Sequence, residues 1–594
     1  MEAWMRKVVA KMEPYLAKNG GPIILAQVEN ELHNNLPEAQ KYIDWCGNMA
    51  ASLGADVPWL MCNGDSAKTT INTCNGNSCT KFLASNGQSG RILVDQPALW
   101  TENEGGFQVW GESPENTTSY FWGRSLPDIS VEILKWFAQG GSHMNYYMWF
   151  GGNHYGPWAG SGITTAYATD VNICPDLLPH EPKHSHLTRL HAAIRKHANA
   201  IVSSPAQIDK KIALEWFDNT TGTFKPGTQQ YAYVYGADSS TVHFVVNDYT
   251  GFIKAKLPDG TVLDLWPSSV TIVDGDGTVE FSSADVAPTT HHREVETLAS
   301  NLPFEYWRDM DAASSPKLAR VNNKTPLEQS DVTEGKTLFL WYSTNVTVRH
   351  NSDSSLQLAT VKANGFTLYV DGSPVASVDN HDHGDGNLTQ SVDLSSVSQG
   401  QHRVDILSES LGFDNGMAAG STRKLKGIIG SVTLGGVDLT DNGWEMRPGL
   451  AGQVFQVFTQ KGAESVHWTK APSQLDGTAT WFKTSFTSPK QTKDLSLLLE
   501  PGKGMGRGWA YVNSHSIGRF WSIERNDGQG ATQSRYVIPW SFLVPEGKDN
   551  VLTLVSTTAG QVDLSTIQIV KSFLTDGPDA EFAADPTGIH SCKL

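Results

Sequence analysis

The sequence changes character near residue 200, and this change limits the folds that the chain can adopt. Up to residue 204, short apolar runs alternate with helical periods, as where the apolar run Ile23–Val28 precedes the helical pattern Glu38–Leu53. Such alternation is typical of a parallel α/β sheet or barrel. From residue 205 onwards the helical period disappears, and short alternating runs separated by turn signals such as Asp371-Gly372 replace it. This second pattern is typical of β-sandwich modules.

Composition excludes several classes of protein. Hydrophobic residues make up 39% and charged residues 18% of the 594 residues, a balance that excludes wholesale disorder. No run approaches the roughly 18 apolar residues of a membrane span. A formal net charge of -17 argues against a nucleic-acid partner, which would require a basic face.

The cysteines and sequons favour the secretory route. Six cysteines are too few for a disulfide scaffold and form no zinc pattern. Cys74 and Cys79 flank a loop rich in Gly and Asn, and are either joined in a small disulfide or both reduced. The sequence contains five candidate N-glycosylation sequons, at Asn116, Asn219, Asn323, Asn345 and Asn387. The amino terminus shows no secretory signal.

Two predicted strands end in carboxylates. The first is followed by Glu29-Asn30-Glu31, and another by Glu102-Asn103-Glu104. In barrel enzymes the chemistry lies where strands end, because the loops there converge on one mouth. A retaining glycosidase needs two carboxyl groups about 5–5.5 Å apart. Helix caps or loop salt bridges are the structural alternative for such residues.

Several longer motifs occur in order along the chain. They are Gly20–Glu31 (GGPIILAQVENE), Val57–Cys62 (VPWLMC), Ile71–Gly76 (INTCNG), Trp100–Glu102 (WTE), Asn145–Asn153 (NYYMWFGGN), Pro182–Leu187 (PKHSHL), Leu340–Thr344 (LWYST) and Trp509–Trp521 (WAYVNSHSIGRFW). Together they resemble glycoside hydrolase family 35, the β-galactosidases, and its plant-type members in particular. The resemblance covers most of the chain.

The resemblance implies a role for each matching residue. Glu31 takes the place of the acid/base, and Glu102 that of the nucleophile. Asn30 takes the place of the residue that holds the sugar 2-hydroxyl, and Tyr147 and Tyr167 those of two substrate-contacting tyrosines. Glu29 and Glu104 are expected to have structural roles, paired with a neighbouring Arg or Lys.

The implied reaction is a double displacement without metal or organic cofactor. Glu102 attacks the anomeric carbon while protonated Glu31 donates to the leaving oxygen; ionised Glu31 then activates a water that releases the sugar with retained configuration. We expect the pKa of Glu31 to be raised and that of Glu102 to be lowered. The His381-Asp382-His383 and Asp385 cluster is expected to be a solvated loop and not a metal site.

In the family, the Glu-Asn-Glu motif belongs to the fourth strand of an eight-stranded barrel, whereas only one helix precedes it here. We therefore expect an incomplete TIM-type barrel and a chain that is the later part of a longer precursor. The predicted domains are the C-terminal portion of a (β/α)8 glycosidase barrel (1–204), a small β-domain (205–300) and two β-sandwich or jelly-roll domains (301–460 and 461–594). Thr169 and the Asn103–Gly106 loop depart from the family pattern, and we expect them to affect leaving-group or linkage preference.

The function predicted is that of a secreted or vacuolar-lysosomal exo-β-galactosidase acting on terminal β-galactose of oligosaccharides or glycans. The alternatives are an exo-β-glucosaminidase of the same family and a non-catalytic carbohydrate-binding protein with a degenerate barrel. The sequence leaves the linkage, the pH optimum and the oligomeric state open.

Overall fold

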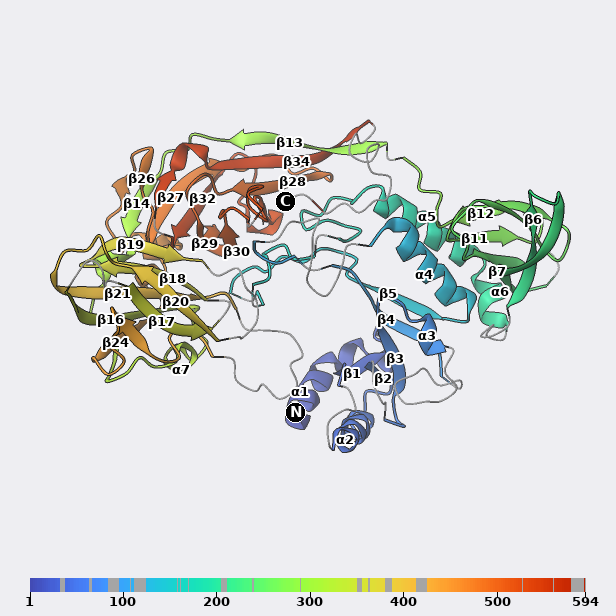
Figure 1. Ribbon diagram of the computed structural model, residues 1–594, viewed down its shortest axis with the longest axis horizontal. Coiled ribbons are helices and arrows are strands. Elements are labelled where there is room, and N and C mark those ends of the chain that lie inside the picture. The colour runs from blue at the N-terminus through green and yellow to red at the C-terminus, as the bar shows by residue number, and fades with distance from the viewer. Residues whose placement is uncertain are drawn as a thin grey trace.

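The computed structural model describes residues 1–32, 38–62, 67–83, 96–106, 108–111, 124–157, 159–160, 162–168, 170–204, 211–237, 240–288, 290–349, 355–361, 364–379, 387–412, 425–525, 527–558, 560–577 and 592. Figure 1 shows a parallel sheet near the centre, an antiparallel sheet on one side of it and two groups of antiparallel sheets on the other. No helix among these residues is long and apolar enough to cross a membrane.

The N-terminal part is built on a five-stranded sheet in which all neighbouring strands run parallel, in chain order. The strands are β1 (Ala26–Asn30), β2 (Trp59–Cys62), β3 (Ile71–Gly76), β4 (Leu99–Glu104) and β5 (His143–Tyr147). The predicted parallel α/β class is therefore confirmed. Within the described residues this sheet is open, with β1 and β5 at its edges; its membership of a TIM-type barrel stays a prediction.

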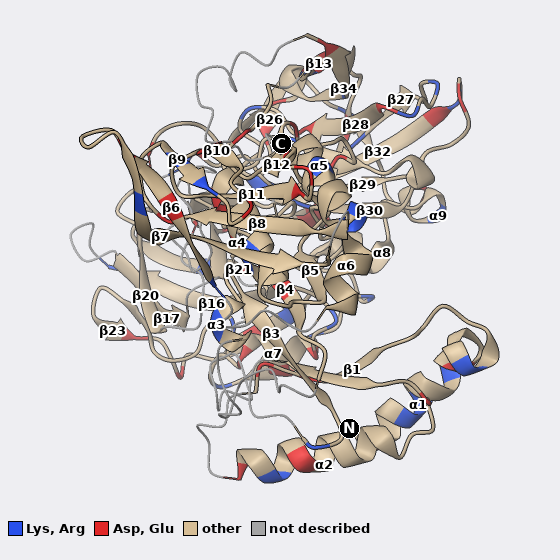
Figure 2. Cartoon of the chain, turned by 90° about the vertical axis from the view of Figure 1, so that its right-hand side faces the viewer, with Lys and Arg blue, Asp and Glu red and all other residues tan. Residues whose placement is uncertain are grey.

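Helices connect and cover these strands. They are α1 (Glu2–Met12), α2 (Ala39–Ala51), α3 (Thr80–Leu83), α4 (Leu126–Ala138), α5 (Lys183–Lys196) and α6 (Ala198–Ser203). The core beside β1 and β2 includes Val28, Trp59 and Ile43 of α2. Figure 2 shows α1 and α2 beside β1, with acidic and basic residues interspersed along both helices.

A seven-stranded antiparallel sheet follows, in the order β10-β9-β6-β7-β8-β11-β12. Its strands are β6 (Ile212–Asp218), β7 (Thr223–Tyr235), β8 (Val242–Asn247), β9 (Ile253–Lys256), β10 (Val262–Leu265), β11 (Ser269–Asp274) and β12 (Val279–Ser282). One core joins Trp100 of β4, Trp136 of α4, Leu190 of α5 and Tyr233 of β7. The helices α4 and α5 thus bury apolar side chains against both sheets. This shared core holds β4 in position.

Two pairs of antiparallel sheets make up most of the remaining structure, as the sandwich prediction requires. The first pair contains β15 (Val321–Asn323), β16 (Phe339–Val348), β17 (Ser355–Val361), β18 (Asn364–Val370), β19 (Ser373–Val378), β20 (Asn387–Asp393), β21 (Gly400–Ser410), β22 (Val432–Leu434), β23 (Val437–Asp438) and β24 (Trp444–Pro448). Its sheets run β15-β24-β16-β21-β18-β19 and β20-β17-β22-β23 around a shared apolar core. The short helices α7 (Gln329–Thr333), α8 (Ala451–Phe455) and α9 (Gln460–Ala463) flank it.

The second pair contains β13 (His291–Ala299), β14 (Glu305–Arg308), β25 (Thr469–Lys470), β27 (Thr480–Thr487), β28 (Leu495–Glu500), β29 (Arg507–Val512), β30 (His515–Trp521), β31 (Tyr536–Ile538), β32 (Asp549–Ser556) and β34 (Gln568–Asp576). Its sheets run β13-β34-β28-β31 and β25-β14-β27-β32-β29-β30; β26 (Gln474–Asp476) pairs separately with β33 (Gln561–Asp563). β13 and β14 thus pair with strands far downstream. The predicted domain boundaries stay a prediction.

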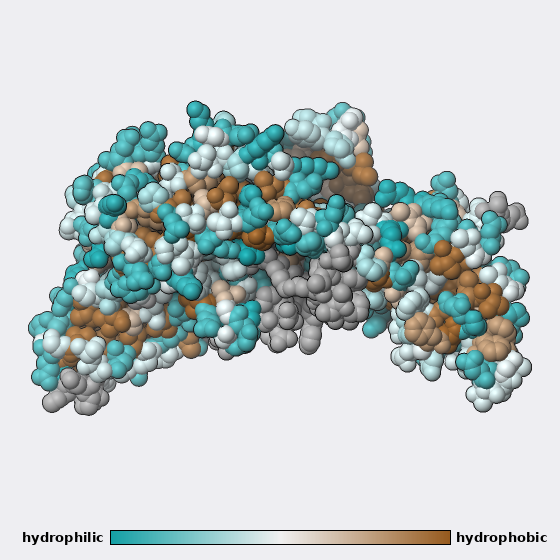
Figure 3. Space-filling view, turned by 90° about the horizontal axis from the view of Figure 1, so that it is seen from above, coloured by the Kyte–Doolittle hydropathy of each residue, from teal (hydrophilic) through white to brown (hydrophobic). Residues whose placement is uncertain are grey.

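Hydrophilic residues predominate on the face in Figure 3, with hydrophobic residues in small groups.

A buried ion cluster joins the two sandwiches. Glu409 of β21 accepts hydrogen bonds from Arg507 Nε of β29 at 2.9 Å and from Arg519 Nε of β30 at 3.1 Å. All three side chains are almost fully excluded from solvent. The second sandwich also contacts the N-terminal part, where the rings of Trp110 and Trp521 stack at 5.6 Å.

Candidate active site

Three carboxylates converge at the carboxyl ends of β1 and β4. Glu31 directly follows β1, while Glu102 and Glu104 lie two residues apart on β4. Oxygens of the three side chains all lie within 4.8 Å of one another. Side chains two residues apart point to the same face of a strand, which explains why Glu104 joins Glu102. Sequence reasoning set Glu104 aside as structural and missed this convergence, although the spacing of two contained the signal.

The backbone at Glu31 turns out of the strand. Its φ is 60°, in the left-handed region that non-glycine residues seldom adopt. Its N–H donates to the carbonyl of Cys62 at 3.1 Å, which ties the end of β1 to the end of β2. Strain of this kind persists where the surrounding structure enforces it, and it gathers at functional sites.

A buried asparagine links the carboxylates. Asn75, on β3 between β1 and β4, donates from Nδ2 to Glu31 Oε1 at 2.9 Å. Its Oδ1 accepts from the Thr101 hydroxyl at 2.8 Å, and a hydrogen bond from Asn75 also favours ionised Glu102. Sequence reasoning missed both β3 as a strand and Asn75, since a run as polar as Ile71–Gly76 lacks the apolar pattern expected of a buried strand.

Burial and mutual repulsion act on the protonation of these groups. Burial, then the charge of Glu31, raises the pKa of Glu102 above its ordinary value. The expectation that the pKa of Glu102 is lowered was therefore wrong in direction: partial burial beside a second carboxylate outweighs the Asn75 hydrogen bond. Burial followed by the charges of Glu31 and Glu102 raises the pKa of Glu104 to about 7, with Arg124 opposing the shift.

Two tyrosines extend the site. Tyr147, the last residue of β5, donates its phenol O–H to Tyr167, whose own O–H donates to Met148 Sδ at 3.0 Å. Burial, Tyr167 and the charge of Glu102 raise the pKa of Tyr147 to about 12. The ring of His154 stacks on that of Tyr167 at 4.6 Å. The structure therefore brings Tyr147 within electrostatic reach of Glu102, and Tyr167 supports it.

Asn30 lies apart from this network. It is exposed, and its Oδ1 accepts from Gln27 Nε2 at 3.0 Å. Glu29 accepts from the backbone N–H of Asn30 at 3.1 Å and from the hydroxyl of Tyr42. Glu29 thus has hydrogen-bonding partners where the sequence analysis expected a cation.

Cys74 and Cys79 are joined by a disulfide with an S–S distance of 2.03 Å, directly before Asn75 and at the start of α3. A second disulfide joins Cys174 and Cys592, which sequence reasoning did not pair. Cys46 and Cys62 are buried free thiols. Cys174 and Cys592 also lie beside His180, but as a disulfide they offer no thiolate to a metal.

The three glutamates are close enough to share a cation, and the chemistry they suggest needs none.

The remaining predicted residues fall in three places. Asn323, Asn345 and Asn387 lie on exposed positions of β15, β16 and β20, and Asn219 is exposed just after β6. Asn116, Thr169 and the cluster His381, Asp382, His383 and Asp385 lie outside the described residues.

Comparison with known proteins agrees with this geometry. Residues 1–194 match the model of glycosyl hydrolases family 35, and residues 479–550 match that of the beta-galactosidase, galactose-binding domain. The resemblance to glycoside hydrolase family 35 is therefore confirmed for the part of the chain that carries the three carboxylates.

Individual relatives extend the similarity to most of the chain. It is 29% identical to beta-galactosidase 14 of Arabidopsis thaliana over 96% of its length and 62% of the relative. It is 28% identical to beta-galactosidase 12 of Oryza sativa subsp. japonica over 96% of its length and 61% of the relative. The chain thus spans about three fifths of these two relatives. An apo lectin structure from Pleurotus ostreatus overlaps 49% of this chain and 84% of that one at 11% identity, with a TM-score of 0.13 that carries no argument.

Proposed function

We propose that the chain acts as a retaining exo-glycosidase that removes terminal β-D-galactose from β-galactosides. The observation that carries the proposal is the approach of Glu31 and Glu102 to within 4.8 Å at the ends of two parallel strands. Retaining enzymes need the short separation, because one carboxylate must reach the anomeric carbon directly. The names of the relatives support galactose as the sugar.

In the proposed reaction, Glu102 is the nucleophile and Glu31 the acid/base. Two carboxylates this close favour a state in which one is protonated. Protonated Glu31 donates to the leaving oxygen as Glu102 forms a glycosyl ester; ionised Glu31 then takes a proton from the water that cleaves this ester. Asn75 supports both steps, since its amide donates to Glu31 and remains in place when that carboxylate becomes charged. No metal or cofactor enters either step.

The environment suits substrate binding by Tyr147. Its phenol stays protonated across the physiological range because burial and nearby charge raise its pKa to about 12. A neutral phenol whose proton is donated to Tyr167 can still accept from a sugar hydroxyl. Tyr167 is proposed as a further substrate contact and Asn30 as the contact to the 2-hydroxyl. Asn30 is the weakest of these assignments by geometry, because its amide oxygen is bonded to Gln27.

An oxidising compartment fits the covalent structure. Two disulfides join Cys74 to Cys79 and Cys174 to Cys592, and disulfides persist in secreted and lumenal proteins. We therefore infer an extracellular or vacuolar-lysosomal location, with β-galactoside oligosaccharides or glycans as the partners.

The test is hydrolysis of a chromogenic β-galactoside by the wild-type chain and by Glu102→Gly, with and without azide. The proposal expects loss of hydrolysis in the variant and, with azide, formation of an α-galactosyl azide, since the small anion attacks from the vacated face. Hydrolysis of the matching β-glucosaminide in preference to the galactoside would support the glucosaminidase alternative. Binding of galactose without turnover by the wild type would support the carbohydrate-binding alternative.

A further inference from the structure

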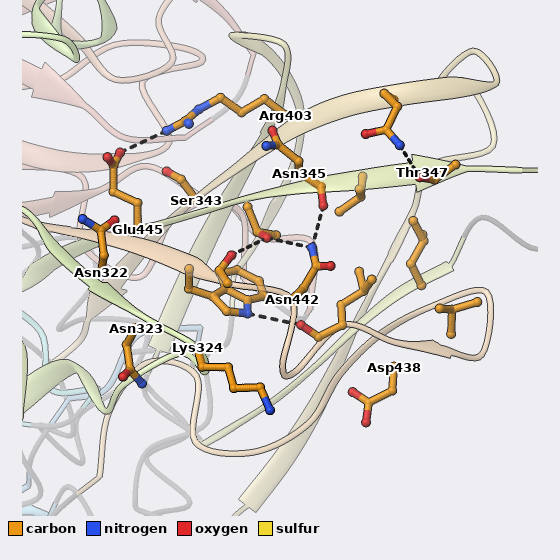
Figure 4. Close-up of a pocket in the computed structure, with 18 of the residues that line it drawn as sticks. Asn322, Asn323, Lys324, Ser343, Asn345, Thr347, Arg403, Asp438, Asn442 and Glu445 are labelled. Atoms are coloured by element: carbon orange, nitrogen blue, oxygen red, sulfur yellow. Dashed lines mark hydrogen bonds and ion pairs between the residues drawn. The ribbon is translucent and has the colours of Figure 1, made fainter.

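A large groove opens in the first sandwich (Figure 4). The strands of this sandwich lie in a different part of the molecule from β1 and β4, which carry the three carboxylates (Figure 1). Its volume is about 950 Å³, near the upper end of the roughly 300–1,000 Å³ of ligand pockets. We call it the Asn345 groove, after the residue at its centre. It is bordered by β15, β16, the start of β21 and the segment 434–445.

The groove follows a strand edge. β24 pairs with β16 only over Leu340–Ser343, whereas β21 pairs with β16 along its whole length. Beyond Ser343, one edge of β16 therefore borders the groove. Val346, Leu439 and Trp444 belong to the buried core beneath the groove, and the accessible lining is dominated by amide, hydroxyl and charged groups.

The segment 434–445 forms one wall of the groove, and hydrogen bonds hold it against β16. Asn442 Nδ2 donates to Thr344 Oγ1 at 2.9 Å and to the carbonyl of Asn345 at 2.6 Å, and Thr344 Oγ1 donates to the carbonyl of Gly443 at 2.8 Å. Trp444 Nε1 donates back to the carbonyl of Leu439 at 3.2 Å. The groove is thus preformed, so a ligand does not have to order its walls on binding.

Several exposed polar groups lie at the rim. Asn322, Asn345 and Arg349 are exposed, and in the described part of the chain their side chains form no hydrogen bond or ion pair. Two ion pairs compensate other charges at the rim, Lys324 with Asp441 and Arg403 with Glu445. Asp438 adds an exposed carboxylate, which accepts from the backbone N–H of Thr440. This mixture favours a neutral ligand with many hydroxyls over a phosphate or a cation, because each hydroxyl both donates and accepts.

The same rim contains two sequons. Asn323-Lys324-Thr325 lies on and after β15, and Asn345-Val346-Thr347 lies on β16; both asparagines line the groove (Figure 4). An N-glycan on either one begins at the groove wall, where tethering raises its effective concentration. We propose that the Asn345 groove is a glycan-binding site for a neutral, hydroxyl-rich glycan, supplied either by the N-glycan of the chain itself or by a free oligosaccharide.

The first experiment uses unglycosylated protein carrying Glu102→Gln, so that a β-galactoside is not consumed. The probes are di-N-acetylchitobiose, the core of an N-glycan, and β-1,4-galactotetraose. Binding is followed by titration and localised by amide hydrogen exchange. The proposal expects at least one probe to protect residues 434–445, and expects Asn322→Ala/Arg349→Ala to weaken that binding about tenfold, the loss of one or two hydrogen bonds.

The matched control is Gln491→Ala/Lys493→Ala, which removes an exposed amide and an exposed cation elsewhere and leaves the binding unchanged. Failure of both sugars to protect the segment would overturn the proposal. Protection that Asn322→Ala/Arg349→Ala does not weaken would also overturn it. Protection by an extended peptide and by neither sugar would indicate strand addition at β16 instead. In protein that keeps Glu102, the groove variants hydrolyse the β-galactoside at the wild-type rate. The binding result at the groove is therefore independent of the proposed function.

The second experiment separates the two sources of glycan. Protein from a secretory host is compared with its Asn323→Gln and Asn345→Gln variants. If the glycan of the chain occupies the groove, one of these substitutions increases amide exchange at residues 434–445 and lets added galactotetraose bind. If the ligand is a free oligosaccharide, galactotetraose protects the segment in the glycosylated wild-type protein as well.

Discussion

Glutamate serves opposite purposes in two regions of this molecule. At the ends of β1 and β4, Glu31, Glu102 and Glu104 face one another within 4.8 Å, and burial followed by nearby charge raises the pKa of Glu102 and of Glu104. Between the sandwiches, buried Glu409 is held by Arg507 and Arg519. Like charges brought together oppose full ionisation and so create groups that exchange protons, whereas a paired buried charge fixes a structure. The comparison predicts that substitutions in the first cluster change chemistry and those in the second change stability.

The largest effect is expected for Glu102→Gln. Removing the nucleophile should lower kcat for a chromogenic β-galactoside by at least about 10⁴-fold, since the amide cannot form the glycosyl ester. Removing the acid/base in Glu31→Gln should cost about 10²–10⁴-fold. Neither variant lowers the thermal unfolding temperature, because each one relieves repulsion between neighbouring carboxylates. Glu29→Gln, two residues from Glu31, is the control and keeps its activity. Loss of folding in Glu102→Gln would assign that carboxylate to structure.

The second largest effect is expected for Glu409→Gln. Neutralising Glu409 leaves Arg519 without its carboxylate and Arg507 with Asp379 alone, and breaking a buried pair in this way destabilises a protein by about 3–5 kcal/mol. Urea unfolding monitored by tryptophan fluorescence measures the loss, and activity per folded molecule stays unchanged. Glu445→Gln removes a half-buried surface partner of Arg403 and Arg320 and should cost less than about 1 kcal/mol. Equal effects of the two substitutions would show that burial of the cluster does not matter.

A smaller effect is expected for Cys74→Ser/Cys79→Ser. The disulfide closes a loop with a sequence separation of 5, and the chain-entropy relation gives about 2 kcal/mol for so short a loop. Activity at 25 °C is retained, because Asn75 and not the disulfide contacts the carboxylates. Dithiothreitol added to both proteins also reduces Cys174–Cys592 in each, and under these conditions the difference in unfolding midpoint should disappear; a difference that survives reduction would point to packing instead.

The smallest effect is expected for Glu104→Gln, and it appears in pH dependence. The folded pKa of Glu104, about 7, lies above the ordinary 4.5. A raised carboxyl pKa means that the folded state holds the proton more tightly, so its contribution to stability is complete below pH 4.5 and is lost as the pH rises through about 7. The wild type should therefore lose stability over this range relative to Glu104→Gln, measured by thermal unfolding at several pH values. Parallel curves for the two proteins would contradict the assignment.

The sequence predicted the parts of the site whose position depends on strand order alone. Parallel strands end on the same edge, so strand order brought the carboxylates after β1 and on β4 to one place; the choice of Glu31 and Glu102 among them came from the family resemblance. Asn75 could not be found in this way, because its role depends on β3 lying between those strands with a polar, buried sequence. The Cys174–Cys592 disulfide joins residues 418 positions apart, and no local pattern encodes such a contact. The pKa of Glu102 was predicted in the wrong direction because the extent of its burial is a tertiary property.

Trapping the glycosyl ester is the most direct test of the central claim, that Glu102 is the nucleophile. The wild-type chain is incubated with an activated 2-deoxy-2-fluoro-β-galactoside, which slows the second step, and peptides are analysed by mass spectrometry. The account predicts one fluorogalactosyl group per chain, carried on Glu102 and absent in Glu102→Gln. Labelling of Glu104 or Glu31, or hydrolysis without any labelled glutamate, would contradict it.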